Sequence, residues 1–166
     1  MLARLVKTNE DYVVLALRLA LGVMILPHGA QKLLGWFGGY GFHGTMQFFT
    51  QTMGIPALFA LLAIIAEFFG GLGLISGLLG RVAALAVAAN MAVAVALVHA
   101  RYGFFMNWFG NQKGEGFEFH LLALAIAAAI MVRGSGAWSL DRLLSRKSEP
   151  AQTASELRRE LSNSAA

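Results

Sequence analysis

The chain lacks cysteine and contains few charged residues. None of its 166 residues is cysteine, which excludes disulfide bonds, thiol redox chemistry and cysteine-ligated metal clusters in this chain. Lys, Arg, Asp and Glu together make up 13% of the residues, against about 25% in typical soluble domains. Because 57% of the residues are hydrophobic and the mean hydropathy is +0.62, the composition indicates a membrane protein rather than a water-soluble one.

Motifs for nucleotide binding and hydrolysis are also missing. The sequence has no glycine-rich phosphate-binding loop and no nucleophile accompanied by its base. The net charge of +4 could indicate a nucleic acid partner. However, the basic residues lie at the ends of apolar segments rather than along one stripe. Membrane topology requires this distribution. We therefore expect one compact unit in contact with a lipid bilayer and no nucleic acid partner.

Four apolar segments are candidates for membrane-spanning helices, which need about 20 residues each. They cover residues 12–34, 56–79, 82–99 and 117–132. The fourth is short, and the aromatic residues between 104 and 109 extend its apolar zone. The sequence thus predicts an all-α, four-helix transmembrane bundle at 12–144. A cytoplasmic segment at 1–11 precedes it, and a flexible cytoplasmic tail at 145–166 follows.

The segment between the first two helices has its own pattern. Phe42, Met46, Phe49 and Met53 recur at helical spacing, while polar residues fall mainly elsewhere around the turn. We expect a short amphipathic helix lying in the outer interface of the membrane.

The loops predict the orientation of the chain. One side would carry Arg4, Lys7, Arg81, Arg133, Arg142, Arg146, Lys147, Arg158 and Arg159, and the opposite side Lys32, Arg101 and Lys113. Cytoplasmic loops carry the excess of Lys and Arg. Both termini are therefore expected in the cytoplasm.

Arg18, Glu67 and Asn90 are polar residues deep inside the predicted helices. An ionisable side chain at the bilayer centre costs at least about 2.5–3.5 kcal/mol, so it usually faces the bundle interior and finds a partner. With a rise of 1.5 Å per residue, Arg18 lies about 9 Å and Glu67 about 14 Å from the inner side. We expect them to form an ion pair, with Asn90 donating to the same carboxylate. Such a pair would either fix the register of the helices, or provide a Glu67 carboxylate that handles protons or faces a substrate.

A second polar layer is expected in the outer half. The same rise puts His28, His99 and His120 at one height, with Glu118 just above and Lys32 one turn after His28 on the same helix face. Three chemistries fit this layer. Imidazole and ammonium groups can hydrogen-bond the carbonyls of a quinone and move its protons. Alternatively, the histidines and Glu118 hold a transition metal, or the histidines make only structural hydrogen bonds.

The first of these chemistries is the one we expect. No HxH or HExxH spacing favours the metal alternative. The predicted pocket opens toward the outer leaflet and binds a quinone-like ligand. Its lining residues would be His28, Lys32, Trp36, His99, Glu118 and His120.

Five stretches of the chain carry a family resemblance. They are LRLALGVMILPHGAQKL, AIIAEFFGGLGLISGLLGR, VHARYGFF, EGFEFHLLALA and GSGAWSLDRLL. Their order and spacing over residues 15–144 resemble the DoxX family of small four-helix membrane proteins. The resemblance implies an inner membrane protein of a bacterium or archaeon.

The resemblance also implies a link to redox chemistry. A related archaeal subunit belongs to a thiosulfate:quinone oxidoreductase, and another member resembles a partner in a membrane-associated oxidoreductase complex. Because this chain has no cysteine, it would supply the membrane side of such an enzyme while a partner subunit carries out the oxidation.

Two functions from other classes remain open, as does association of the chain with another copy of itself. The chain can be a membrane adaptor or assembly factor without chemistry, whose basic residues 142–147 and tail recruit a cytoplasmic partner. It can also be a small-molecule or proton-coupled transporter in which Glu67 titrates at mid-membrane.

Overall fold

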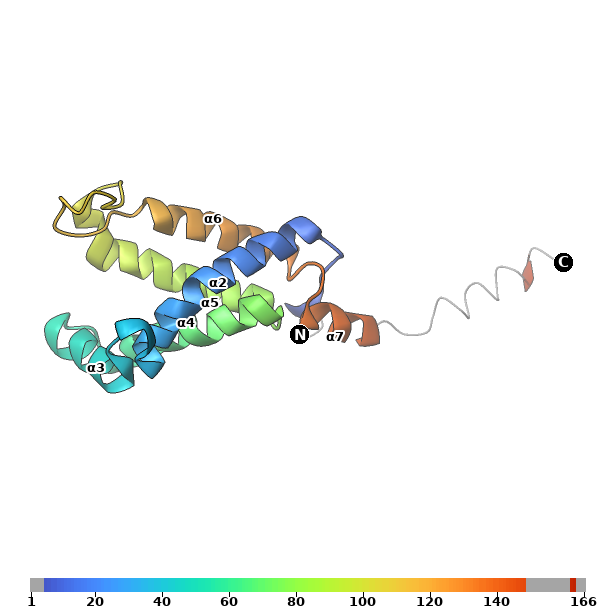
Figure 1. Cartoon of the computed structure of the whole chain (residues 1–166). Helices are drawn as coiled ribbons and strands as arrows, with labels where there is room; N and C mark the ends of the chain where they lie inside the picture. The colour runs from blue at the N-terminus through green and yellow to red at the C-terminus, as the bar shows by residue number, and fades with distance from the viewer. Residues whose placement is uncertain (1–4, 149–161, 164–166) are drawn as a thin grey trace.

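The computed structural model describes residues 5–148 and 162–163, and within these ranges every regular element is helical. The long helices are α2 (Tyr12–Leu34), α4 (Ala57–Ser76), α5 (Gly80–Ala94) and α6 (Glu118–Arg133). They pack into a single elongated bundle (Figure 1). The shorter helices are η1 (Trp36–Gly38), α3 (Gly41–Gln47), η2 (Phe48–Thr52), η3 (Val95–His99), η4 (Ala100–Tyr102) and α7 (Leu140–Ser148).

The bundle has two distinct ends, which Figure 1 shows at the right and left of the view. The α7 end holds residues 5–11, the turn at 77–80 and α7. The α3 end holds α3, η2 and the loop at 103–117. The amphipathic segment expected between the first two helices is helical, as α3 continues into η2.

Three helices in the described part of the chain are long and apolar enough to cross a membrane. They are Tyr12–Leu34, Ala57–Ser76 and the continuous run Gly80–Tyr102, with mean hydropathies of 1.8, 2.3 and 2.1. The all-α prediction is therefore confirmed, whereas α6, with 16 residues, falls below the length of the other three. α7 extends four residues into the predicted tail, and residues 149–161 and 164–166 of that tail lie outside the described ranges.

Large apolar side chains cover the outer faces of the long helices. Val13, Val23, Leu58, Phe59, Leu62, Leu85, Val93 and Leu122 are each at least 48% exposed on these faces. The interior holds small and branched residues, among them Leu21, Ile25, Ile64, Leu74, Val87, Ala127 and Ile130. Such an outer surface is unfavourable in water and suits contact with lipid.

Glycines bring α2 and α4 into close contact. A Cβ atom added to Gly29 would lie 2.4 Å from the backbone nitrogen of Phe68, and one added to Gly71 would lie 2.9 Å from the Cα of Leu26. Small residues allow this approach where lipid supplies no hydrophobic force between helices. These contacts fix the register of the two helices, setting Gly29 opposite Glu67 and Phe68.

The contact at Gly29 predicts the effect of adding a single methyl group. Gly29→Ala should lower the free energy of unfolding by about 1–3 kcal/mol, because the backbone of α4 must move away. Thermal unfolding in detergent micelles measures this change. The control is Ala20→Val, which enlarges an exposed position of the same helix. Equal melting temperatures for Gly29→Ala and the parent chain would contradict the packing described.

Candidate functional site

Arg18 is fully buried near the α7 end of the bundle. Its guanidinium donates hydrogen bonds of 2.5–3.3 Å to backbone carbonyl oxygens alone. The acceptors are Leu74 and Ile75 in the last turn of α4, and Ser135, Ala137 and Trp138 in the loop before α7. The last carbonyls of a helix have no partner within it and carry partial negative charge. Arg18 thus caps the end of α4 and ties it to the 135–138 loop.

The predicted ion pair between Arg18 and Glu67 is therefore wrong. The two heights were taken from the helix ends, but the glycine contacts shift α2 relative to α4. Glu67 lies opposite Gly29, which is about 16 Å along α2 from Arg18 at 1.5 Å per residue. No side chain spans that separation.

Asp141 completes the buried polar group at this end. Its carboxylate accepts hydrogen bonds from the backbone N–H groups of Leu79, at 2.7 Å, and Gly80, at 3.0 Å, where α5 begins. The Ser135 hydroxyl donates to the same carboxylate at 2.5 Å. A carboxylate at a helix N-terminus is favourable because the helix dipole is positive there. Arg18 and Asp141 together hold both sides of the α4–α5 turn.

The turn leaves no room for side chains where it meets this polar group. Gly77 has a φ of +67°, and a Cβ there would lie 2.4 Å from the Cβ of Ser139. We did not single out Ser135 and Asp141 as polar-network residues from the sequence. The signal was present in GSGAWSLD, where small and polar residues join two helices without an apolar run.

A second polar cluster lies at the middle of the bundle. The Lys32 ammonium is 2.5 Å from Glu67 Oε2, and the Asn90 amide donates to Glu67 Oε1 at 2.8 Å. The hydrogen bond expected between Asn90 and Glu67 is therefore present, while Lys32 takes the role expected of Arg18. The side chains of Glu67 and Lys32 are 8% and 25% exposed. This cluster links α2, α4 and α5 and leaves the Lys32 side chain partly accessible.

The imidazoles form a separate tier toward the α3 end. The rings of His99 and His120 lie 4.0 Å apart between their centroids. Since Asn90 and His99 are nine residues apart on one helical run, this tier lies about 13 Å beyond the Lys32–Glu67–Asn90 cluster. His28 is exposed and close enough to His120 to act on it electrostatically. Within the predicted outer layer, Lys32 therefore pairs with Glu67, while His99 and His120 form a separate tier.

Hydrogen bonding distinguishes the two stacked histidines. His99 Nδ1 lies 2.8 Å from the carbonyl oxygen of Glu115, and because a carbonyl only accepts, Nδ1 carries the proton. His120 is 6% exposed, and its buried Nδ1 has no hydrogen-bond partner in the described part of the chain. Buried polar atoms are rarely left without a partner.

Two predicted site residues, Glu118 and Trp36, make contacts other than those expected. The Glu118 carboxylate accepts from the backbone N–H of Met106 at 2.9 Å and from the indole of Trp108 at 3.1 Å, so it fastens the 103–117 loop. Trp36 is 60% exposed in η1 and contacts Phe37 edge-on. The prediction that both line one pocket with the histidines is not matched by these contacts.

The metal alternative required four donors to converge. Within the described ranges, no three His, Asp or Glu side chains are arranged to hold a metal ion. The Glu118 carboxylate is engaged by the loop, and His99 Nδ1 by Glu115. These contacts do not favour the metal alternative at His28, His99, His120 and Glu118.

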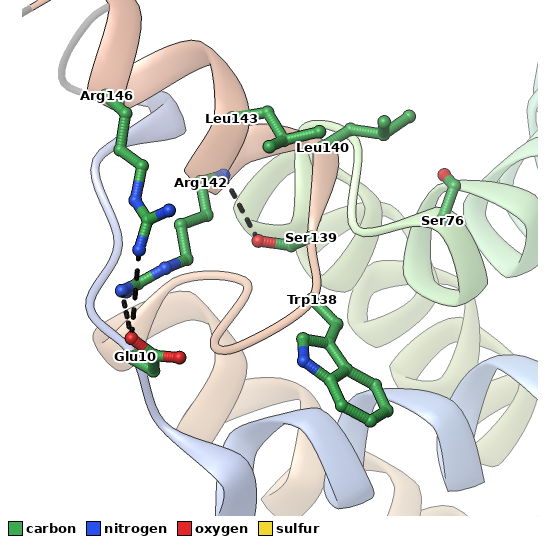
Figure 2. A pocket seen from close by; sticks show the side chains of 8 residues that line it. All are labelled: Glu10, Ser76, Trp138, Ser139, Leu140, Arg142, Leu143 and Arg146. Atoms are coloured by element: carbon green, nitrogen blue, oxygen red, sulfur yellow. Dashed lines mark hydrogen bonds and ion pairs between the residues drawn. The ribbon is translucent and has the colours of Figure 1, made fainter.

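A pocket lies at the α7 end, remote from the histidines. Its volume is about 430 Å³, and it lies between the N-terminal segment, the end of α4 and α7 (Figure 2). The lining residues are Glu10, Ser76, Trp138, Ser139, Leu140, Arg142, Leu143 and Arg146. Beside it, Asp11 caps α2 and pairs with Arg133 at 2.7 Å. The Val14 N–H and Arg133 hold the pKa of the Asp11 carboxyl below its usual value.

Comparison with known proteins identifies the family. The DoxX family model matches residues 13–100, more than half of the chain. The chain belongs to the DoxX family. It is also 32% identical over 141 residues to the inner membrane protein YqjF of Escherichia coli strain K12, covering 85% of this chain and 98% of that protein. No solved structure matches the chain. Family membership and the three apolar helices make this DoxX protein an integral membrane protein that contacts the lipid bilayer.

The carbonyl contacts of Arg18 predict a large effect of its removal. Arg18→Gln should lower the free energy of unfolding by at least about 3 kcal/mol, because several buried carbonyls lose their donor. Thermal unfolding in detergent measures the loss. Arg101→Gln, which removes an exposed arginine bonded to Leu97 in its own helix, is the control and should cost far less. Equal losses in the two variants would refute the capping role.

The central cluster predicts strong coupling between Lys32 and Glu67. Lys32→Met and Glu67→Gln should each cost about 2 kcal/mol or more, since each leaves the other group without its partner. The double variant should cost at least about 1 kcal/mol less than the sum. The same cycle on the more exposed pair Asp11–Arg133, with Asp11→Asn and Arg133→Met, is the control and should give less than 1 kcal/mol. Additive effects at Lys32 and Glu67 would contradict the pairing.

Proposed function

We propose that this DoxX protein is a redox-linked subunit of the bacterial inner membrane that binds a quinone-like amphipathic ligand by its headgroup. The ligand would lie toward the α3 end, between His28, Lys32 and the His99–His120 pair. The observation that carries the proposal is the buried Nδ1 of His120, which has no partner among the described residues. A headgroup that hydrogen-bonds this nitrogen would remove the cost of leaving it unpaired.

The neighbouring groups support a ligand with polar oxygens and an apolar tail. The Lys32 ammonium and a protonated His120 nitrogen are donors, and quinone carbonyls are acceptors. Exposed Phe104 and Phe105, and helix faces rich in leucine and valine, offer apolar surface around the polar groups. A bound quinone would supply two-electron redox chemistry at those carbonyls.

The residues of this chain would position the ligand and handle protons. Because Nδ1 of His99 donates to Glu115, its Nε2 is free to accept a proton or a hydrogen bond. Imidazole nitrogens donate and accept hydrogen bonds, so the His99–His120 pair is suited to contact the oxygens of a headgroup. Glu67, held by Lys32 and Asn90, would keep the ammonium in place.

The proposed topology has four spans and both termini in the cytoplasm. α6 is 16 residues long, about 24 Å, and the aromatic loop before it extends its apolar zone. By the bounds of the elements, Lys7, Arg81, Arg133, Arg142 and Arg146 belong to the α7 end. Lys32, near the end of α2, and Arg101 and Lys113 lie toward the α3 end. The positive-inside rule then assigns the α7 end to the cytoplasm. The name of the related YqjF protein favours the inner membrane.

The chain would act with a partner rather than as a complete enzyme. It contains no cysteine, so oxidation of a sulfur compound through a protein thiol would have to occur on another subunit. The electron donor would bind that partner, and this chain would provide the membrane ligand site.

A second candidate is a proton-coupled transporter, which the central position of Glu67 favours. The Glu67 carboxylate of α4 contacts Lys32 of α2 and Asn90 of α5, and the Lys32 side chain is partly accessible. Proton or substrate flux in liposomes that Glu67→Gln removes would select this function over ligand binding. An adaptor without chemistry would keep its function in every histidine variant.

Ligand binding predicts a rise in stability with a quinone analogue. At a concentration 100 times Kd, a ubiquinone or menaquinone analogue should stabilise the protein by about 2.7 kcal/mol. His120→Ala and His28→Ala should abolish the shift in melting temperature. His43→Ala, which removes an exposed imidazole of α3, is the control and should retain it. A shift that persists in His120→Ala, or no shift in the parent chain, would contradict the proposal.

A further inference from the structure

We infer that the pocket at the α7 end binds the headgroup of an anionic phospholipid, with its acyl chains lying along Trp138, Leu140 and Leu143. This site is remote from the imidazoles and does not depend on the ligand proposed there. Its lining combines two guanidinium groups, two hydroxyls and large exposed apolar side chains (Figure 2). That combination matches a molecule with a phosphate at one end and hydrocarbon at the other.

The charge of the pocket is incompletely balanced. Arg142 is hydrogen-bonded to Glu10, and Arg146 lies 3.8 Å from the same carboxylate, beyond hydrogen-bond distance. Figure 2 shows both guanidinium groups turned toward this one acidic side chain. One carboxylate cannot neutralise two guanidinium groups, so the pocket keeps a net positive charge. Arg146 is 62% exposed at its side chain and makes no hydrogen bond within the described residues, which leaves its donors available.

The apolar side of the pocket fits lipid chains. Trp138 is 78% exposed, and its ring meets Tyr12 edge-on at 6.3 Å. Leu140 and Leu143 are 42% and 57% exposed on α7. Tryptophan and tyrosine are enriched where membrane meets water, and basic residues bind anionic headgroups with about 1 kcal/mol each. The same pocket borders the end of α4, one of the three helices long enough to span a bilayer, so it lies at the level of lipid headgroups.

The loop geometry holds this site in place. Ser139 donates to the Gly136 carbonyl and accepts from the Arg142 backbone N–H, which starts α7 beside the pocket. The buried Arg18 guanidinium donates hydrogen bonds to the carbonyls of Ala137 and Trp138. The position of Trp138 and Arg142 is therefore fixed by the buried polar group of the bundle.

Quenching of Trp138 fluorescence by brominated lipids tests the inference. The chain has three tryptophans, and Trp36→Phe with Trp108→Phe leaves Trp138 as the reporter. In nanodiscs of phosphatidylcholine, a rising fraction of brominated phosphatidylglycerol should quench Trp138 more than brominated phosphatidylcholine does. Trp108 as the single tryptophan, at the α3 end, should show no such preference.

Three charge variants make the test specific. Arg146→Gln should weaken the preference for phosphatidylglycerol about fivefold, the equivalent of about 1 kcal/mol. Arg133→Gln removes the same charge at the same end, outside the pocket, and should leave the preference unchanged. Glu10→Gln should strengthen the preference about fivefold, because it frees both guanidinium groups.

Several results would overturn the inference. Equal quenching by the two brominated lipids would show that no anionic headgroup is selected. If Arg133→Gln and Arg146→Gln weakened the preference for phosphatidylglycerol equally, the preference would depend on the net charge of this end and not on the pocket. Competition by inorganic phosphate or by an acidic peptide as effectively as by phosphatidylglycerol would assign the pocket to a soluble anion or a protein instead.

Discussion

The structure depends on how two charged side chains are satisfied inside apolar helices. Arg18 is satisfied by backbone carbonyls at the end of α4 and in the loop before α7. Glu67 is satisfied by the ammonium of Lys32 and the amide of Asn90. A charge left without such partners in hydrocarbon would cost several kcal/mol, so these contacts dictate which helix faces turn inward. The two charged groups find their partners independently, one at an end of the bundle and one at its middle.

This arrangement organises the remainder of the molecule from the α7 end outward. Arg18 and Asp141 hold the α4–α5 turn, and Arg81 adds hydrogen bonds to the carbonyls of Met131 and Val132 at the end of α6. Close contacts at Gly29 and Gly71 fix the register of α2 against α4 and so the position of Glu67 along α2. The stacked imidazoles of His99 and His120 lie closer to the α3 end, in η3 and in the first turn of α6.

The helices were readable from the sequence because hydrophobic runs and their ends are local signals. The first predicted span matches α2, and Gly77 and Gly80 mark the turn between α4 and α5. The glycines of α4 allow close packing, since a Cβ added to Gly70 would lie 3.0 Å from Cγ2 of Val87 and one added to Gly71 2.9 Å from Cα of Leu26. The contact of Asn90 with Glu67 was also predictable, since both lie at the middle of adjacent antiparallel helices.

The partners of the charges were harder to predict because they depend on register between helices. The sequence gives the distance of a residue from the end of its own helix. It does not give the relative heights of the ends of neighbouring helices. For this reason Arg18 was assigned to Glu67, and His28 to the height of His99. Backbone carbonyls were also overlooked as partners for an arginine, although the end of any helix offers them. Ser135 and Asp141 lie in a loop, where no periodic pattern points to burial.

The most direct test of this account is the distance from the Glu67 carboxylate to nitrogen in the protein within a bilayer. Solid-state NMR with ¹⁵N and ¹³C labels measures the dipolar coupling between the Glu67 side-chain carboxyl carbon and the Lys32 ammonium nitrogen. The structure, with Nζ 2.5 Å from Oε2, predicts a strong coupling to Lys32 and none to the guanidinium nitrogens of Arg18. A strong coupling to Arg18, or none to Lys32, would contradict the separation of the two charges.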